Sequence, residues 1–356
     1  MKKVSIIGHL GIDKCQLSGQ IVKTQTVTKE LEKRFGSEEV VKFDTHGSKI
    51  KNIIKSPFQA LKALNFSSNA VIFPAQNGLR IFAPLLVFFK KFFKGRKLHY
   101  VVIGGWLSEF LKGKPILSER LKKFDFIYVE TSTMKKALEE QGFCNVVVMP
   151  NFKDLKILEP SDVIYSTGEP HKLCTFSRVM KEKGIEDAVN AVKSANEKIG
   201  RTVYTLDIYG QVEKDQTEWF ENFKTSFPDH VKYCGVVDFE KSVDVLKNYY
   251  ALLFPTHFYT EGIPGTIIDA FAAGVPVISS KWESFNDIVD DSIDGIGYDF
   301  YDRDELANIL AGLATAPDRI EQMKPNCIEK ARKYLPENAI GILVQKLLIQ
   351  KPEENK

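Results

Sequence analysis

The segment Ala251–Val289, ALLFPTHFYTEGIPGTIIDAFAAGVPVISSKWESFNDIV, contains the pattern that decides the fold. Its first five residues form an apolar run that ends at a proline, residues 266–273 have a helical pattern closed by Gly274, and residues 275–280 form a β-branched run. These features predict a strand, a loop, a helix and a second strand. Strands that alternate with helices are typical of a parallel sheet.

The loop before the predicted helix has the features of an anion-binding site. Glu261 and Gly265 lie in this loop, where free backbone N–H groups and the positive end of the helix dipole favour an anion. Glu261 and Asp269 are close enough in the sequence to reach different parts of one ligand. The same residues also fit a purely structural interpretation, because Thr266 and Asp269 form a variant of the capping box.

Length and composition indicate a protein of two globular domains. With 356 residues the chain can bury two cores, and 44% apolar with 27% charged residues is ordinary for a soluble protein. No apolar run is long enough to span a bilayer and the N-terminus lacks a signal pattern, which predicts a cytoplasmic protein. The five scattered cysteines, of which Cys15 is the first, argue against a disulfide framework and a zinc site.

The charges are distributed unevenly along the chain. Residues 1–150 carry 25 Lys and Arg against 12 Asp and Glu, a balance of +13, whereas residues 151–356 carry 24 against 34, a balance of −10. Residues 45–108 include ten Lys or Arg and no acidic residue, which predicts a surface that meets an anionic partner. No nucleic-acid-binding motif accompanies this charge, so nucleic acid is not the expected partner.

In residues 80–97, RIFAPLLVFFKKFFKGRK, the phenylalanine pairs 88–89 and 92–93 are interleaved with basic residues. This pattern fits an interfacial helix that lies on anionic lipid at the inner face of the membrane. It fits equally well a helix that covers a sheet and has a solvated basic end. Both interpretations stay open at the level of the sequence.

The chain contains two series of β-type runs separated by helical patterns. The expected strands of the first series are 4–8, 40–44, 70–74, 98–104, 126–130 and 146–150, and those of the second are 173–177, 205–210, 231–235, 251–255, 275–280 and 296–300. This alternation predicts two Rossmann-like parallel-sheet domains. They are expected at 1–152 and 171–335, with a linker at 153–170 and a final helix within 336–356.

The loop after the first expected strand contains Gly8, Gly11 and Gly19. A glycine-containing loop at this place is where such sheets bind ligands. The spacing is not GxGxxG, and Asp44 lies farther from the glycines than the dinucleotide fingerprint requires. A nicotinamide-dependent oxidoreductase is therefore an alternative that ranks low.

The sequence of the deciding segment resembles a known family. The run from Glu261 to Pro264, then Asp269, then the stretch 273–278 is similar to the donor-site signature of the retaining glycosyltransferases of family four. The resemblance implies that Glu261 lies near the donor sugar and that Asp269 binds the ribose hydroxyls. The family usually has glutamate at the second position, and Asp269 is shorter by one methylene group.

The resemblance also implies the other residues of the donor site. Arg178 and Lys183 match the family's basic pair at the first strand–helix junction of the second domain and would neutralise the donor diphosphate. A guanidinium binds two phosphate oxygens and an ammonium acts as a point charge, so the two complement each other. With this charge no metal is expected, and no cofactor other than the nucleotide sugar. The remaining donor-site residues are Gly19, Gly210, Gly262, Gly265 and Thr266.

One motif departs from the family pattern, and another has the sequence of a metal-binding motif found in other glycosyltransferases. The family histidine after the fourth strand has no match, because the sequence there is Ile103-Gly104-Gly105-Trp106. Trp106 and Glu109 are candidates for the acceptor side, and a purely structural tryptophan in a strand–helix loop is the alternative. The sequence Asp302-Arg303-Asp304 has the DxD spelling of metal-dependent glycosyltransferases. Asp302 followed by Glu305 instead predicts a capped helix over 303–315.

The resemblance implies a fold and a function for the whole chain. The fold is the GT-B type, in which two Rossmann-like domains face a cleft and the C-terminal helix crosses back to the first domain. The implied activity is transfer of a sugar from a nucleotide diphosphate to an acceptor hydroxyl. The acceptor hypothesis is a lipid-linked glycan in bacterial surface polysaccharide assembly. The alternative is a non-catalytic, membrane-associated partner of another glycosyltransferase.

Overall fold

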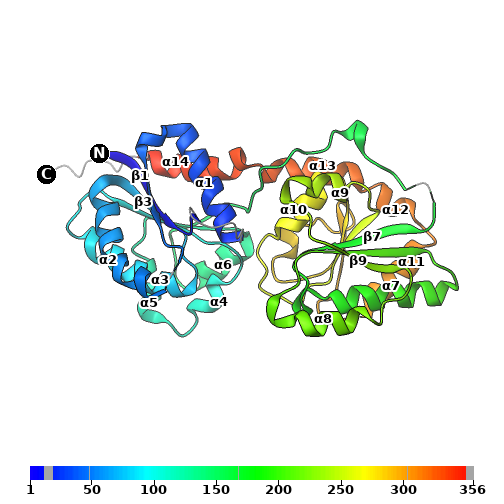
Figure 1. Cartoon of the computed structure of the whole chain (residues 1–356). Coiled ribbons are helices and arrows are strands. Elements are labelled where there is room, and N and C mark those ends of the chain that lie inside the picture. The colour runs from blue at the N-terminus through cyan, green and yellow to red at the C-terminus, as the bar shows by residue number, and fades with distance from the viewer. Residues whose placement is uncertain (12–18, 48, 167, 303, 350–356) are drawn as a thin grey trace. The chain divides into compact units, whose positions relative to one another are not determined.

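The computed structural model describes residues 1–11, 19–47, 49–166, 168–302 and 304–349 (Figure 1). Cys15 and Arg303 lie outside these residues. The chain divides into two compact units. The first comprises Met1–Asp154 with Pro336–Lys356, and the second comprises Leu155–Leu335.

The first unit is built on a six-stranded sheet of order β2-β1-β3-β4-β5-β6 in which every neighbouring pair is parallel. Its strands are β1 Lys2–Gly8, β2 Val40–Asp44, β3 Ser67–Ile72, β4 Lys97–Val101, β5 Phe126–Val129 and β6 Val146–Val148. Its helices are α1 Gly19–Phe35, α2 Lys49–Phe66, α3 Gln76–Lys90, α4 Leu107–Leu111, α5 Pro115–Leu121, α6 Ser132–Glu140 and α14 Pro336–Leu348.

Alternating side chains of the first sheet belong to two different cores. Ile6 packs in the core that includes residues of α1 and α14, whereas Ile7 packs in the core that includes residues of α2 and α3. Figure 1 shows α1 and α14 on one face of this sheet and α2, α3 and α5 on the other. The near-continuous apolar runs of the strands follow from this arrangement, because a sheet covered on both faces buries every side chain.

The second unit repeats this design with a sheet of order β12-β11-β10-β7-β8-β9, whose six strands are also parallel. Its strands are β7 His171–Phe176, β8 Tyr204–Tyr209, β9 Val231–Gly235, β10 Ala251–Phe254, β11 Val277–Ser280 and β12 Gly295–Tyr298. Its helices are α7 Ile185–Ile199, α8 Thr217–Lys224, α9 Ser242–Leu246, α10 Gly265–Ala272, α11 Glu305–Leu313, α12 Asp318–Glu321 and α13 Lys324–Ala331.

Short 3₁₀ helices occupy several connections of the chain. They span Ser37–Glu39, Pro160–Asp162, Lys181–Lys183, Lys214–Gln216, Phe239–Lys241, Phe285–Asp287 and Arg332–Tyr334. Each of the twelve strands overlaps the range expected from the sequence, so the two parallel sheets are confirmed. The strand–loop–helix–strand order of the deciding segment is present as β10, α10 and β11.

The segment between the two sheets packs on the second unit. Leu155 and Leu158 contact the core beneath α10, and the backbone N–H of Leu158 donates to the carbonyl of Ala272 at 2.8 Å. Helix α14 instead buries Ile340 and Leu343 in the first unit. Asp302 accepts the backbone N–H of Glu305 at 3.1 Å, which fits its assignment to the start of α11.

The phenylalanine-rich segment 80–97 corresponds mainly to α3. Its residues Phe82, Leu86 and Val87 are buried in the core that the first sheet shares with α2 and α3, and most of its other apolar residues are partly buried there. Phe88 and Phe92 are 53% and 69% exposed. The segment therefore covers the sheet and leaves two phenylalanines on the surface. No helix in the described ranges is both long and apolar enough to cross a membrane.

Candidate active site in the second unit

The order of the second sheet points to one edge as a binding site. Along the sheet the strand order reverses between β10 and β7, which are neighbours in space although three strands apart in the chain numbering. In open parallel sheets ligands bind outside the carboxyl ends of the strands at such a reversal. The loops that leave β7 and β10 at this edge carry Arg178, Lys183 and Glu261.

Lys183 and Glu261 form an ion pair across this reversal point. The Lys183 and Glu261 side chains are 12% and 18% exposed. The Lys183 Nζ atom also lies 5.2 Å from the ring centroid of Phe254 and 5.0 Å from that of Phe258. Aromatic faces attract a cation, so the ammonium is held from three sides while part of it remains accessible. The two residues assigned to diphosphate and sugar thus meet in one place.

Two glycines allow the loops at this edge to touch. Gly184 has φ +68°, and a Cβ atom there would lie 1.8 Å from the carbonyl oxygen of Pro255 in the loop after β10. Gly210, after β8, has φ +136°, and its Cβ atom would lie 1.7 Å from the carbonyl oxygen of Ser177. Any side chain at either position would collide with backbone, which only glycine avoids. Gly210 was assigned to donor binding, and the structure shows in addition a packing role.

Arg178 has a different environment from Lys183. Its side chain is 63% exposed, and its Nη1 atom lies 2.8 Å from Oε2 of Glu213, which follows β8. Exposed ion pairs contribute little stability because water screens both charges. The guanidinium can therefore exchange this carboxylate for another anion at small cost.

Helix α10 begins at Gly265 without a side-chain cap. The Thr266 hydroxyl donates to the carbonyl of Phe176, the last residue of β7, and so ties the helix start to the neighbouring strand. The capping box expected from Thr266 and Asp269 is therefore not formed. The Thr266 hydroxyl is instead bonded to the backbone carbonyl of Phe176, 90 residues earlier in the sequence.

Asp269 is 3% exposed, and its Oδ1 atom accepts a hydrogen bond from the hydroxyl of Ser242 at 3.2 Å. Ser242 is the first residue of α9, so the contact joins two helices. Glu261 and Asp269 consequently differ: the first lies in a partly open loop and the second is packed inside the unit.

A second hydrogen-bonded pair at this edge, His257–Asp187, was not predicted from the sequence. His257 Nε2 lies 2.5 Å from Asp187 Oδ2, and the backbone N–H of His257 donates to the carbonyl of Glu182 at 2.8 Å. The hydrogen bond from Gln216 lowers the pKa of the Glu182 carboxyl. The loops after β7, β8 and β10 are thereby joined into one network. A histidine three residues after a strand was the signal in the sequence, and it is too common to single out.

Three residues of the expected site, Gly19, Trp106 and Glu109, lie in the first unit. Gly19 begins α1 and has open space where a Cβ atom would lie. Trp106 Nε1 donates to the carbonyl of Ile103 at 2.8 Å, and Glu109 pairs with Lys112 at the surface. Trp106 is thus held by its own loop and Glu109 faces water.

A buried ion pair lies where the family histidine is missing. Lys23 Nζ is 2.6 Å from Glu130 Oε1, and the two side chains are only 4% and 3% exposed. The same carboxylate oxygen accepts the backbone N–H of Gly104 at 3.0 Å. This pair has no signal in the sequence, because its members are 107 residues apart and each resembles a solvated charge.

Among the residues that the structure describes, no group of three or more His, Cys, Asp and Glu side chains is arranged to hold a metal ion. Residues 170–316 match the sequence model of the family described as glycosyl transferases group 1. This segment is a group 1 glycosyltransferase domain. It contains Arg178, Lys183, Glu261 and Asp269, so the residues gathered at the sheet edge belong to the matched part of the chain.

The chain also has a curated relative. An uncharacterized glycosyltransferase of Methanocaldococcus jannaschii is 24% identical over 233 residues, which are 59% of this chain and 57% of that protein. The chain thus spans little more than half the length of the relative that it matches.

Solved glycosyltransferase structures share the architecture around this domain. Sucrose-phosphate synthase from Thermosynechococcus elongatus has a TM-score of 0.75 at 14% identity, and the match covers 98% of each chain. Anabaena HepE in complex with UDP has a TM-score of 0.73 at 14% identity, covering 98% of this chain and 99% of that one. The pneumococcal O-GlcNAc transferase GtfA, in complex with UDP and GlcNAc, has a TM-score of 0.62 at 20% identity, covering 81% and 58%. The fold is therefore of the GT-B type.

Proposed function

We propose that the protein transfers a sugar from a UDP-sugar to an acceptor hydroxyl with retention of configuration. The observation that carries the proposal is the Lys183–Glu261 pair at the strand-order reversal of a group 1 glycosyltransferase domain. An ammonium and a carboxylate held together there suit the two ends of a sugar nucleotide, one anionic and one rich in hydroxyls. The UDP in the structures of HepE and GtfA supports the choice of nucleotide.

The pair gives a physical account of donor binding. Without donor, Glu261 neutralises Lys183. A diphosphate carries more negative charge than one carboxylate, so it competes for the ammonium and releases Glu261 toward the sugar. Arg178 exchanges Glu213 for the second phosphate, and the first N–H groups of α10 add donors near Gly265.

The chemistry of transfer then depends on charge. The bond between the anomeric carbon and the diphosphate oxygen breaks, the acceptor hydroxyl oxygen bonds to that carbon and gives its proton to the departing diphosphate, and UDP leaves. Lys183, Arg178 and the α10 amides stabilise the developing negative charge, while Glu261 stabilises the cationic sugar. These groups supply the charge that a metal ion would otherwise provide, and turnover unaffected by EDTA is the expected result.

The proposed acceptor is a lipid-linked glycan used in bacterial surface polysaccharide assembly, and the protein works as a peripheral protein on the inner face of the membrane. The support is the exposure of Ile54 and Phe58 on α2, each 65%, together with Phe88 and Phe92. These residues fall within residues 45–108, which have no acidic side chain. Sedimentation with anionic liposomes should exceed that with neutral ones, and equal sedimentation would contradict the membrane proposal.

A second candidate function is that of a non-catalytic partner of another glycosyltransferase. The observation that favours it is the burial of Asp269, which is 3% exposed and bonded to Ser242 rather than open to a ribose. Such a protein would bind a partner chain or lipid and release no nucleoside diphosphate.

The deciding experiment is a thermal-shift panel of UDP, GDP, dTDP, ADP, CMP and NAD, followed by turnover with the matching sugar nucleotides. A ligand at about 100 times its Kd adds roughly 2.7 kcal/mol to the free energy of unfolding. We expect the largest shift with UDP and release of UDP from a UDP-sugar when acceptor is present. A shift with NAD alone would indicate the oxidoreductase, and UDP binding without turnover would favour the non-catalytic partner.

A further inference from the structure

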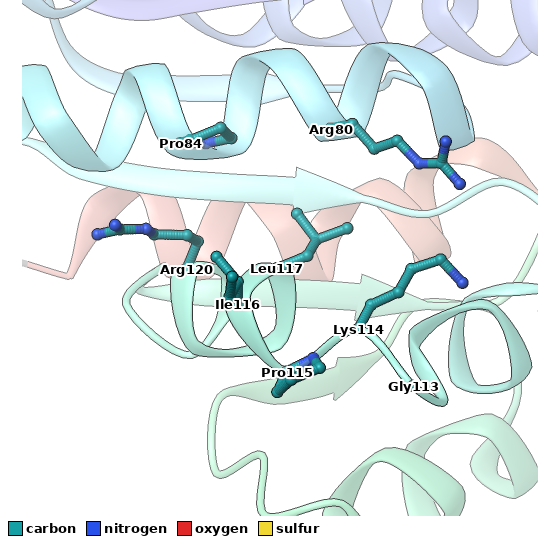
Figure 2. A pocket seen from close by; sticks show the side chains of 8 residues that line it. All are labelled: Arg80, Pro84, Gly113, Lys114, Pro115, Ile116, Leu117 and Arg120. Carbon is teal, nitrogen blue, oxygen red and sulfur yellow. The ribbon is translucent and has the colours of Figure 1, made fainter.

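A pocket of about 310 Å³ lies between α3 and the segment that leads into α5 in the first unit (Figure 2). This volume is at the lower end of the range for small-molecule sites. The residues that line it are Arg80, Pro84, Gly113, Lys114, Pro115, Ile116, Leu117 and Arg120.

The walls of the pocket combine two chemistries. Pro84, Ile116 and Leu117 form an apolar wall between the two helices (Figure 2). Ile116 is 77% exposed, so this wall reaches the surface. Phe88, which is 53% exposed, lies one helical turn after Pro84 on α3 and extends the same face.

The polar part of the lining is entirely cationic. Arg80 and Lys114 extend together at one end of the pocket and Arg120 lies at the other (Figure 2). The Arg80 Cζ atom is 5.2 Å and the Lys114 Nζ atom 4.4 Å from the ring centroid of Phe110. Two positive charges therefore share one aromatic ring, and their repulsion favours an anion near both.

The neighbouring carboxylates are engaged elsewhere. Glu109 pairs with Lys112, and Glu119 pairs with Lys122. Within the described part of the chain, no acidic side chain forms an ion pair with Arg80, Lys114 or Arg120. The pocket therefore offers three cations next to an apolar wall and has no internal counter-charge.

We infer that this pocket binds an amphiphilic anion, with a phosphate group at Arg80 and Lys114 and an apolar chain along Pro84, Ile116 and Leu117. Two sources have this chemistry: an anionic phospholipid of a bilayer, and a lipid phosphate such as a prenyl phosphate. The inference deepens the proposed contact with lipid, on which it rests, and it is independent of the donor site, because no residue of the pocket belongs to the Lys183–Glu261 site.

The test measures binding of soluble amphiphiles to the full chain by titration calorimetry at low salt. The probes are farnesyl phosphate, monomeric dihexanoyl phosphatidylglycerol, its zwitterionic phosphatidylcholine counterpart and inorganic phosphate. We expect either anionic amphiphile to bind at least tenfold more tightly than both inorganic phosphate and the zwitterionic lipid. Tighter binding of farnesyl phosphate identifies a lipid phosphate, and tighter binding of phosphatidylglycerol identifies the bilayer lipid.

A matched pair of triple variants locates the site. The pocket variant is Arg80→Gln with Lys114→Gln and Arg120→Gln, and the control is Lys29→Gln with Lys33→Gln and Lys136→Gln, which removes the same charge from exposed positions of the same unit outside residues 45–108. Each basic residue near an anionic lipid contributes on the order of fivefold in affinity, so the pocket variant, which lacks three of them, should lose roughly a hundredfold. The control should lose less than tenfold.

A third variant tests the apolar wall without altering charge or core. Ile116→Ser, at a residue that is 77% exposed, should weaken farnesyl phosphate about fivefold and leave inorganic phosphate unchanged. Equal losses in the two triple variants, equal binding of phosphate and amphiphile, or no binding at all would overturn the proposal. The thermal shift with UDP should be the same in all variants, so failure of the pocket and failure of the donor site are distinguishable.

Discussion

The two units contain the same sheet type and the same kind of ion pair in different settings. Lys183 and Glu261 lie at the strand-order reversal of the second sheet and are 12% and 18% exposed. Lys23 lies in α1, the helix after β1, and Glu130 follows β5 in the first unit; their side chains are 4% and 3% exposed. The comparison shows that two ion pairs of the same composition differ in how far solvent reaches them.

The hydrogen bonds of the two pairs support this distinction. Glu130 also accepts the backbone N–H of Gly104, so the buried pair fixes the loop after β4. Lys183 is held by the faces of Phe254 and Phe258, contacts that leave its remaining N–H groups available. The first pair is therefore buried within the fold, and the second is placed as the proposed binding of an anionic donor requires.

The largest effect is expected from breaking the buried pair. Lys23→Met leaves the Glu130 carboxylate without its cation in a dry environment, which costs about 3–5 kcal/mol. The double variant Lys23→Met with Glu130→Met should recover much of this loss. Urea unfolding measures both changes, with Lys42→Met as the control, because the Lys42–Glu32 pair is 44% and 25% exposed. A loss below 1 kcal/mol for Lys23→Met would show that the pair is not structural.

Substitutions in the partly exposed Lys183–Glu261 pair should change the activity of the protein and not its stability. Lys183→Met should lower kcat/KM for the UDP-sugar by about 10²–10³ and weaken UDP, because a preorganised positive charge is lost. Glu261→Gln should lower turnover by a similar factor and retain or strengthen UDP binding, because the ammonium is released. Steady-state kinetics and UDP titration separate the two roles. If both variants weakened UDP to the same degree, the assignment of Glu261 to the sugar would be wrong.

The two sheets can also be compared by the pKa of the histidines in their strands. Burial lowers the pKa of His99 in β4 to about 3, and its ring nitrogens lie 2.9 Å from Tyr128 Oη and 3.1 Å from Asn69 Oδ1. Because the pKa is lower in the folded state than the usual 6.5, protons favour the unfolded state below pH 6.5. Stability should fall by on the order of 2 kcal/mol between pH 7.5 and pH 5.

The variant His99→Gln should remove most of this pH dependence in urea unfolding. His171→Gln in β7 is the matched control, because burial lowers the pKa of His171 also but the Glu169 carboxylate opposes the change. An unchanged pH profile for His99→Gln would mean that other groups cause the acid sensitivity.

The smallest effect is expected at the exposed arginine. Arg178→Gln should weaken UDP by tenfold or less, and the effect should shrink with added salt because the guanidinium is 63% exposed. Arg201→Gln is a close control, since the Arg201–Glu169 pair has the same exposure, 60% and 32%, in the same unit. Equal UDP affinity for both variants would remove Arg178 from the donor site.

Local patterns explain which parts could be predicted from the sequence. The apolar runs at 251–255 and 275–280 specify β10 and β11 without help from distant residues. The meeting of Lys183 and Glu261 could also be predicted, because both follow strands of a parallel sheet and such loops lie at one edge. Where local pattern and topology agree, the sequence was sufficient.

Contacts that depend on packing alone could not be predicted. The sequence suggested that Thr266 caps its own helix, but its hydroxyl instead reaches Phe176, whose position depends on how α10 lies on β7. The Lys23–Glu130 and His257–Asp187 pairs have no local signature. Residues 80–97 left two interpretations open because a sheet-covering helix and an interfacial helix need the same apolar pattern.

The assignment of α14 to the first unit has a consequence for synthesis of the chain. Helix α14 supplies Ile340, Leu343 and Leu347 to the core that the first sheet shares with α1, yet it is translated after the whole of Leu155–Leu335. At roughly 5–20 residues per second the ribosome needs about 10–35 seconds to make that intervening segment. The first unit therefore emerges with one face of its sheet partly bare, and it waits for the second unit to be made before its own core is complete.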